Sequence, residues 1–376
     1  MSEDPLLAGL DVYLVGGAVR DSLLGYPFHD RDWVIVGTTP DVMRQRGFRQ
    51  VGRDFPVFLH PTSGEEYALA RTERKKGRGY TGFEVFATPE ITLEQDLERR
   101  DLTINAIAQD AQGEFIDPFL GRSDLKAGIL RHVGPAFKED PLRVIRLARY
   151  YARYAHLGFS LADATQELCA AMASQGELSE LAAERVWQES ARALEERDPG
   201  RFFTFLADIH ALAPWWRELA DSVLLHSACK ALERTVEAGI DTPALRWAAL
   251  MSAVDDAARS ALAERLKLPT QWQEAARYLA DSIRTLDSRP DGAALVAWAQ
   301  RIDYWRRGER WHQLLPLVRL FLPGLDLIQL TQVLEEARQL SPRQWVEAGM
   351  KGPEIGKQLA AERKVLLDQA AQQLKN

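Results

Sequence analysis

The stretch "LVGGAVRDSLLGYPFHDRDWVIVG", residues 14–37, decides how the first part of this chain is interpreted. A short apolar segment leads into a glycine pair, a short helical segment follows, and two aspartates stand at the start of a second apolar segment. Glycines at the end of a strand let a ligand approach the backbone closely, and the amides of the following helix can receive a phosphate.

The two aspartates, Asp30 and Asp32, are expected on one face of a sheet, because side chains alternate along a strand. Two carboxylates so placed can hold two divalent cations roughly 3.5–4 Å apart, the arrangement that serves phosphoryl transfer. A D-x-D pattern alone also fits an exposed turn, so the rest of the sequence has to choose between the two interpretations.

Composition indicates a globular protein of more than one domain. The chain has 376 residues, of which 46% are hydrophobic and 27% charged. No segment approaches the roughly 18 apolar residues of a membrane span, and the start "MSEDPLLAGL" lacks the pattern of a secretory signal. We therefore expect a cytoplasmic protein without a membrane partner. The two cysteines, Cys169 and Cys229, are too few and too far apart for a metal knuckle or a disulfide framework.

The chain divides into two regimes, which predict an α+β fold. Up to about residue 118, short β-branched segments alternate with turns, as in "VYLVGG", "DWVIVG", "FPVFLHP", "EYALART" and "FEVFAT", and helical stretches are expected after Gly17 and around residues 92–108. From about Lys138 onward, apolar residues recur at helical spacing, so the remainder is expected to be helical.

Charge argues against a protein that coats nucleic acid indiscriminately, because the formal net charge is −7. Basic residues are nevertheless concentrated in residues 71–78 and 131–153. Such runs are usually solvated faces, but their closeness in sequence to the aspartate motif leaves phosphate contact open.

Four motifs in order and spacing resemble one family. G-G-x-x-R-D at 16–21, D-R-D-W at 30–33, "RRDLTINA" at 99–106 and "EDPLRVIRLAR" at 139–149 are together similar to the class II tRNA nucleotidyltransferases, the CCA-adding enzymes, and to bacterial poly(A) polymerases. The resemblance is to the proteobacterial branch and covers residues 12–215 strongly. The helical C-terminal region matches loosely, chiefly in "GMKGPEIGKQL" at 349–359.

The resemblance implies roles for residues in the first two motifs. Asp30 and Asp32 would hold catalytic magnesium ions, with Glu66 of "EEYALART" as a supporting carboxylate. Gly17 and Arg20 would contact the triphosphate of the incoming nucleotide. The implied cofactor is therefore Mg²⁺.

The third motif carries the next pair, Arg100 and Asp101. In the family, Arg100 would reach the nucleotide and Asp101 would accept from the ribose 2′-hydroxyl. The alternative is structural, with Arg100 and Asp101 forming a local ion pair.

The fourth motif predicts a helix with a cationic face. Asp140 and Pro141 form a good N-cap and first-turn pair. The arginines recur at helical spacing on one face, and an apolar set for packing lies on another; these are Arg143, Arg146, Arg149 and Arg153, and Leu142, Ile145, Ala148 and Ala152. By resemblance the helix is a protein template: Asp140 and Arg143 pair with the base edge, and Arg146 and Arg149 approach the nucleotide. Otherwise Asp140 is only a cap and the arginines are solvated.

The resemblance also implies a domain plan and a reaction. Residues 1–137 would form a nucleotidyltransferase head, 138–220 a helical neck with the template helix, and 221–376 a helical body and tail that bind tRNA. The enzyme would use CTP and ATP to extend the 3′ end of tRNA with cytidine, cytidine and adenosine, gripping the acceptor arm, and no DNA partner is expected. Residues 72–89 would form the family's flexible loop, and tryptophans such as Trp187, Trp215, Trp216 and Trp247 are expected to pack in the core.

One departure from close relatives is expected: many of them carry a C-terminal His-Asp phosphohydrolase domain, and we expect this chain to lack it. Of the seven histidines, only His29 is followed by an aspartate, and that pair belongs to the N-terminal motif rather than to a C-terminal domain; the histidines are His29, His60, His132, His156, His210, His226 and His312. Three alternatives stay open: a poly(A) polymerase, a CC-adding or A-adding specialist, and a catalytically silent RNA-binding module.

Overall fold

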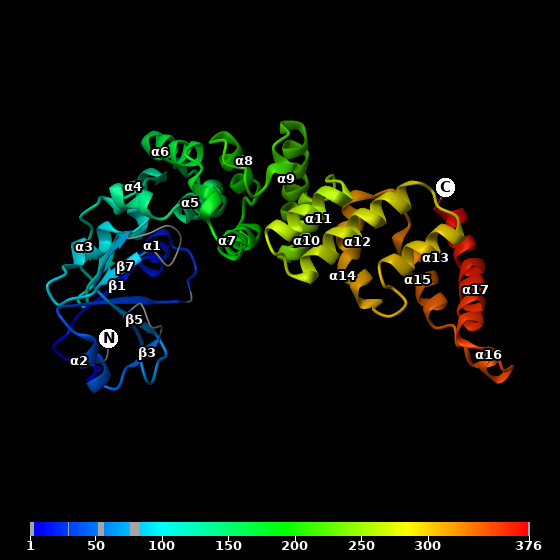
Figure 1. Ribbon diagram of the computed structural model, residues 1–376, viewed down its shortest axis with the longest axis horizontal. Helices are drawn as coiled ribbons and strands as arrows, with labels where there is room; N and C mark the ends of the chain where they lie inside the picture. Colours follow the sequence, from blue (N-terminus) through cyan, green and yellow to red (C-terminus); the bar gives the residue numbers. More distant parts are fainter. Residues whose placement is uncertain (1–3, 29, 52–55, 76–82, 375–376) are drawn as a thin grey trace. The chain divides into compact units, whose positions relative to one another are not determined.

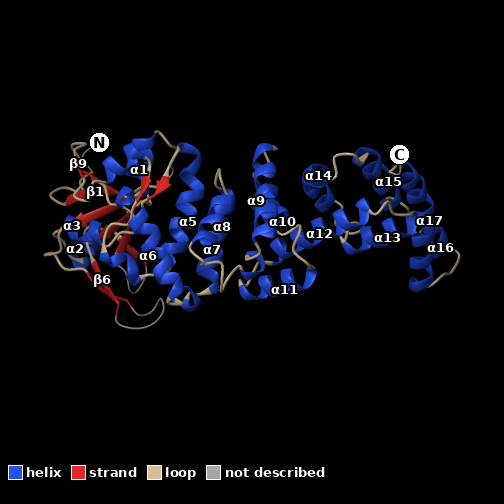
Figure 2. Ribbon diagram, turned by 90° about the horizontal axis from the view of Figure 1, so that it is seen from above, coloured by secondary structure: helices blue, strands red, loops and turns tan. Residues whose placement is uncertain are grey.

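The computed structural model of the chain describes residues 4–28, 30–51, 56–75 and 83–374. These residues form two compact units, Met1–Trp215 and Trp216–Asn376. Every strand of the described part belongs to the first unit, and the second unit is helical (Figures 1 and 2). The predicted α+β fold is confirmed.

The first unit is built on a seven-stranded sheet in the order β3-β4-β5-β2-β1-β8-β9. Its strands are β1 (Asp11–Val15), β2 (Asp32–Val36), β3 (Arg49–Val51), β4 (Val57–Leu59), β5 (Glu66–Leu69), β8 (Ala108–Gln109) and β9 (Phe115–Ile116). β2 and β5 run parallel, and the other neighbours are antiparallel. Two smaller pairs accompany it: β6 (Thr72–Lys75) with β7 (Phe83–Phe86), and β10 (Ile129–Leu130) with β11 (Ser160–Leu161).

Both faces of the central strand β2 are apolar, and each contributes to a different core cluster. Val34 packs with Val15 in one cluster, and Ile35 packs with Tyr67 in the other. This follows from the alternation of side chains along a strand. Asp32 lies two residues before Val34, so it projects from the same face as Val34, at the end of the strand.

The helices of the first unit include the predicted template helix, α5. They are α1 (Gly17–Leu24), α2 (Pro40–Gln45), α3 (Leu93–Glu98), α4 (Gly121–Ala127), α5 (Leu142–Tyr154), α6 (Asp163–Ser174), α7 (Ala183–Glu195) and α8 (Gly200–Asp208). α5 packs against α7 and α8. The predicted packing face of α5 is confirmed, since Leu142, Ile145, Ala148 and Ala152 are all buried.

The second unit consists of nine further described helices, which pack on one another. They are α9 (Ser222–Glu237), α10 (Pro243–Leu250), α11 (Asp256–Arg265), α12 (Thr270–Asp287), α13 (Gly292–Arg301), α14 (Glu309–Phe321), α15 (Leu327–Arg338), α16 (Arg343–Glu347) and α17 (Gly352–Gln373). The predicted core tryptophans of both units are buried: Trp187, Trp215, Trp216 and Trp247. No helix in the described part of the chain is long and apolar enough to cross a membrane.

Three local expectations are corrected. Asp30 does not lie on a strand, because β2 begins at Asp32, where its partners β1 and β5 also reach their ends at Val15 and Glu66. The helical stretch expected around 92–108 is broken, since α3 ends at Glu98 and a separate 3₁₀ turn follows. The part after Lys138 is not wholly helical, because the short strand β11 interrupts it.

Other expectations concern segments that are only partly described. Residues 76–82, at the centre of the expected loop, and His29 lie outside the described residues. The flanks of that loop form the β6–β7 pair.

Of the two cysteines, Cys169 is buried and Cys229 is half-buried.

A tight contact at the start of α4 gives a stability prediction. A Cβ added at Gly121 would collide with the carbonyl oxygen of Thr103 and lie 2.8 Å from Ile107 Cγ1. Both atoms belong to buried residues. We expect Gly121→Ala to lower the free energy of unfolding by about 3 kcal/mol, measured by urea denaturation. Gly134→Ala is the matched control, because its Cβ would meet nothing within 4 Å; equal unfolding free energies for the two variants would contradict this account.

Candidate active site

One cavity of about 820 Å³ in the first unit gathers all of the site residues expected from the sequence. It is lined by Gly17, Arg20, Asp30, Asp32, Glu66, Arg100, Asp101, Asp140, Arg143, Arg146 and Arg149. Sequence reasoning did not assign several further lining residues to the site: Gly16, Asp21, Arg71, Arg99, Asn105, Tyr150, Arg153, Arg185 and Arg192.

Carboxylates from two strands line one part of the cavity. Asp32 opens β2 and stands beside Glu66, the first residue of the parallel strand β5, so both side chains project from the same face. Asp30 precedes the strand by two residues and also lines the cavity. Burial raises the pKa of Asp32, the Arg100 charge lowers it, and the Asp30 charge raises it.

These carboxylates are hard oxygen donors, the ligand type that divalent cations such as Mg²⁺ prefer. Among the described residues, no group of three or more His, Cys, Asp or Glu side chains could hold a metal ion by itself. An ion bound by Asp30 and Asp32 would complete its coordination with water or with oxygen atoms of a substrate, as Mg²⁺ does at phosphate sites.

Of the two adjacent glycines, only Gly16 is required by its backbone conformation. Gly16 caps α1 with φ 71° and ψ −129°, a conformation that residues with a side chain avoid. A Cβ there would lie 2.9 Å from Arg100 Nη1 and 4.0 Å from Asp32 Oδ2. Gly17 is the first residue of α1. The turn therefore requires Gly16, which lets Arg100 pass close to the backbone beside Asp32.

Arg20 lines the cavity, and its guanidinium is bonded to Asp21 and Asn105. Its Nε and Nη2 donate to the two carboxylate oxygens of Asp21 at 2.8 and 3.0 Å, and its Nη1 donates to Asn105. The rings of Tyr150 and Tyr154 each have their centroid 5.3 Å from its guanidinium carbon. Asp21 was detectable in principle, because it follows Arg20 within the G-G-x-x-R-D motif.

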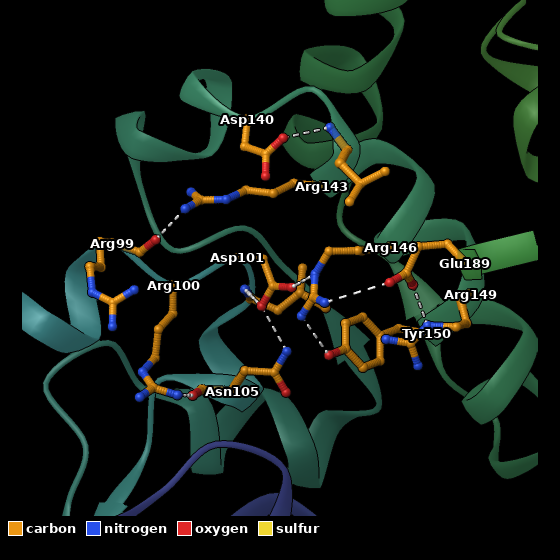
Figure 3. A network of polar contacts seen from close by, with 12 residues as sticks. Arg99, Arg100, Asp101, Asn105, Asp140, Arg143, Arg146, Arg149, Tyr150 and Glu189 are labelled. Carbon is orange, nitrogen blue, oxygen red and sulfur yellow. Dashed lines mark hydrogen bonds and ion pairs between the residues drawn. The ribbon is translucent and has the colours of Figure 1, made fainter. Parts of the chain in front are cut away.

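Arg100 and Asp101 do not pair with each other, so the local ion pair considered as an alternative is absent. Arg100 Nη2 contacts Asp96 Oδ2 at 3.3 Å. Asp101 instead accepts from the Leu102 amide at 2.9 Å, from Asn105 Nδ2 at 2.8 Å and from Arg146 Nε at 2.8 Å (Figure 3). Burial raises the pKa of Asp101, but the Arg146 charge and the Asn105 hydrogen bond outweigh it and hold the pKa well below its usual range.

Asp140 stands one step further from the helix than expected. α5 begins at Leu142 with Pro141 as its N-cap, and the Leu142 amide donates to Asp140 Oδ1 at 3.1 Å. The other oxygen, Oδ2, accepts from Arg185 Nη2 on α7 at 3.1 Å. Arg143 donates to the carbonyl oxygen of Ala136 at 2.7 Å and to that of Arg99 at 2.6 Å, and Figure 3 shows the second of these bonds.

The remaining arginines of α5 do not form a solvated face. Arg149 Nε donates to Glu189 Oε2 at 2.6 Å, and Arg146 Nη1 lies 3.8 Å from Glu189 Oε1 (Figure 3). Arg153 contacts Asp21 at 3.2 Å. The side chain of Glu189, on α7, is only 6% exposed. Nothing in the sequence around residue 189 marks this carboxylate as the partner of two α5 arginines.

Comparison with known proteins identifies the family. The model of the poly A polymerase head domain matches residues 12–131. A CCA-adding enzyme of Pseudomonas putida (strain W619) is 45% identical over 364 residues, which covers 94% of this chain and 96% of that protein. This chain belongs to the CCA-adding enzyme family. A second CCA-adding enzyme, from Marinobacter nauticus, is 43% identical over 369 residues, covering 96% of this chain and 99% of that protein.

Solved structures share the fold of this CCA-adding enzyme family member. The CCA-adding enzyme of Bacillus stearothermophilus in complex with CTP aligns with a TM-score of 0.70 at 23% identity, covering 97% of this chain and 91% of that one. The Thermotoga maritima CCA-adding enzyme complexed with tRNA aligns with a TM-score of 0.68 at 21% identity, with the same two coverages of 97% and 91%.

Family membership makes this chain an enzyme, a nucleotidyltransferase. Nucleotidyltransferases in general use divalent metal ions. The alternative of a catalytically silent RNA-binding module is therefore set aside.

Proposed function

We propose that this chain adds cytidine, cytidine and adenosine in turn to the 3′ end of tRNA, consuming CTP and ATP and releasing diphosphate without a nucleic-acid template. One observation carries the proposal: a single cavity is lined both by the carboxylates Asp30 and Asp32 and by the base-edge pair Asp140 and Arg143. The curated relatives are named for the same activity.

The carboxylate end of the cavity is the proposed metal site. Asp30 and Asp32 would hold Mg²⁺, with Glu66 as a supporting carboxylate on the neighbouring strand. Bound divalent ions would supply charge that stabilises the attacking 3′ oxygen and the leaving diphosphate. The protein's own part is to place Asp32 and Glu66 side by side at the ends of two paired strands, with Asp30 two residues before the first of them.

The turn at Gly16 and Gly17, and the turn at Arg99–Asp101 (the RRD turn), are the proposed triphosphate and ribose sites. Gly17, Arg20 and Arg100 would face the triphosphate. Arg100 Nε is buried and has no hydrogen-bond partner within the described residues, which leaves a donor for a phosphate oxygen. Asp101 already accepts three hydrogen bonds. A carboxylate offers about four acceptor positions, so one remains for the ribose 2′-hydroxyl.

The α5 end is the proposed base site, with Asp140 and Arg143 at the base edge and Arg146 and Arg149 beside the nucleotide. We further propose that residues 1–137 act as the head, 138–220 as the neck, and 221–376 as the body and tail that hold the tRNA acceptor arm. We place the reaction in the cytoplasm.

Incubating the purified protein with a tRNA that lacks its three terminal nucleotides tests the proposal. We expect two cytidines with CTP alone, and cytidine, cytidine and adenosine with CTP and ATP together, as read by sequencing the 3′ ends. A tRNA that already ends in these three nucleotides is the control and should gain none. A long adenosine tail would instead indicate a poly(A) polymerase, and a product that stops after two cytidines a CC-adding enzyme.

A further inference from the structure

Asp96, on α3, is a buried carboxylate that does not line the cavity but bonds to residues that do. Its side chain is 0% exposed. Oδ1 accepts from the backbone amide of Arg71 at 3.2 Å and from Arg99 Nε and Nη2 at 3.0 and 2.7 Å. Oδ2 accepts from Arg100 Nη2 at 3.3 Å. One carboxylate therefore anchors three cavity-lining arginine residues from two segments of the chain.

The turn that Asp96 anchors also receives the template helix. The carbonyl oxygen of Arg99 accepts from Arg143, and the carboxylate of Asp101 accepts from Arg146 (Figure 3). A displaced Arg99–Asp101 turn would thus move the partners of two α5 arginines. Asp96 is therefore connected, through this turn, both to an arginine proposed for the triphosphate and to the α5 arginines proposed for the base and the nucleotide.

We propose that Asp96 is a positioning residue for nucleotide binding: it holds the Arg100 guanidinium beside Gly16 and Asp32, where the incoming triphosphate is expected. This inference rests on the proposed function, because it takes the ligand to be CTP or ATP. Arg100 has five N–H donors on a flexible stem, and a fixed acceptor behind it determines which of them face the cavity. Arg100 Nη1 also donates to the carbonyl oxygen of Asn105 at 3.4 Å, so the loss of Asp96 would leave one long contact to orient the guanidinium toward the phosphates.

Asp124 provides a matched control for a purely structural role. It is also a buried carboxylate of the first unit, and it accepts from Thr103 Oγ1 at 2.7 Å and from Arg131 Nε at 3.0 Å. Neither Asp124 nor those two donors lines the cavity. Asp124→Asn should therefore affect stability without affecting nucleotide affinity.

The test measures CTP binding by calorimetry in the absence of tRNA, together with KM and kcat for CTP and ATP on tRNA. We expect Asp96→Asn to weaken CTP binding and to raise both KM values by about tenfold, the usual effect of losing a hydrogen bond to a charged group, with kcat changed less than about threefold. Asp124→Asn should bind CTP like the parent protein. Unchanged CTP affinity in folded Asp96→Asn would overturn the proposal, as would an equal loss in both variants.

A double mutant tests whether Asp96 acts through Arg100. If it does, Asp96→Asn combined with Arg100→Ala should bind CTP no more weakly than Arg100→Ala alone. Multiplied effects, about a hundredfold, would show that Asp96 acts elsewhere.

A replacement variant and a comparison with the overall reaction complete the test. Should Asp96→Asn fail to fold, Asp96→Glu replaces it, with an expected loss of about threefold in CTP affinity because the charge is kept but displaced; no loss would overturn the proposal. A parent protein that binds CTP but adds no nucleotides to tRNA would refute the proposed function while the calorimetric comparison still decides the role of Asp96.

Discussion

Asp32→Asn should abolish nucleotide addition, lowering kcat by about a thousandfold or more, while the protein stays folded. An amide is a much poorer ligand for a hard cation than a carboxylate, and two-metal catalysis depends on the ligand charge. The fold should tolerate the change. Burial and the Asp30 charge raise the pKa of Asp32 against the opposing effect of Arg100, so the ionised carboxylate is disfavoured in the folded state relative to the unfolded chain.

The raised pKa of Asp32 also predicts an effect of the substitution on stability. A carboxyl group whose pKa is raised by folding makes the protein more stable as the pH falls through the raised pKa. We expect this contribution to be absent from Asp32→Asn, whose thermal midpoint at neutral pH should equal or exceed that of the parent. Single-turnover incorporation of labelled CMP measures the rate. Glu65→Gln is the control, because Glu65 precedes Glu66 but does not line the cavity; a folded Asp32→Asn protein with more than a tenth of the parent rate would refute the metal assignment.

Spacing alone predicted that Asp30 and Asp32 share a face, and the resemblance to the family added the other residues that meet in the cavity, Glu66 among them. Asp32 and Glu66 each open an apolar strand, and the pairing of those strands aligns them. The N-terminal strand boundary was wrong at Asp30, because a strand needs a paired neighbour and β1 turns away at Gly16. Such a boundary depends on the partner strand, which residues 30–32 do not encode.

The charge partners could not be predicted, because they depend on tertiary contacts. Four arginines at helical spacing on α5 look like a solvated cationic face when only that helix is considered. In the fold, three of them join a closed circuit of polar groups that connects α1, the RRD turn, α5 and α7: Asp101, Arg146, Glu189, Arg149, Glu196, Arg153, Asp21, Arg20 and Asn105, which returns to Asp101. Charges in such a network are paired before the nucleotide arrives, so the cavity is pre-organised rather than merely basic.

The choice of base should depend on Asp140, and Asp140→Ala should raise the incorporation of UMP or GMP relative to CMP by about tenfold or more. A carboxylate accepts from the exocyclic amino group of cytosine or adenine, and a guanidinium donates to the adjacent ring nitrogen, so Asp140 and Arg143 suit both bases. Uracil and guanine present a carbonyl oxygen there. Two acceptors would then face each other, at a cost of about 1–3 kcal/mol, which corresponds to a tenfold to hundredfold preference.

The contacts of Asp140 predict different base selection for its Ala and Asn variants. Its two oxygens accept from the Leu142 amide and from Arg185, one bond each, so acceptor positions remain for a base. Asp140→Asn keeps an acceptor for the Leu142 amide and adds an amide donor that suits the uracil or guanine carbonyl, so it should shift selection further toward UTP and GTP than Asp140→Ala does. Arg143→Ala should instead lower the use of CTP and ATP alike, because both bases lose the same donor. Competition assays with all four nucleotides, read by sequencing the 3′ ends, measure these ratios; unchanged ratios in folded Asp140→Ala and Asp140→Asn proteins would mean that the carboxylate serves only the start of α5, and that base discrimination lies with other residues of the cavity.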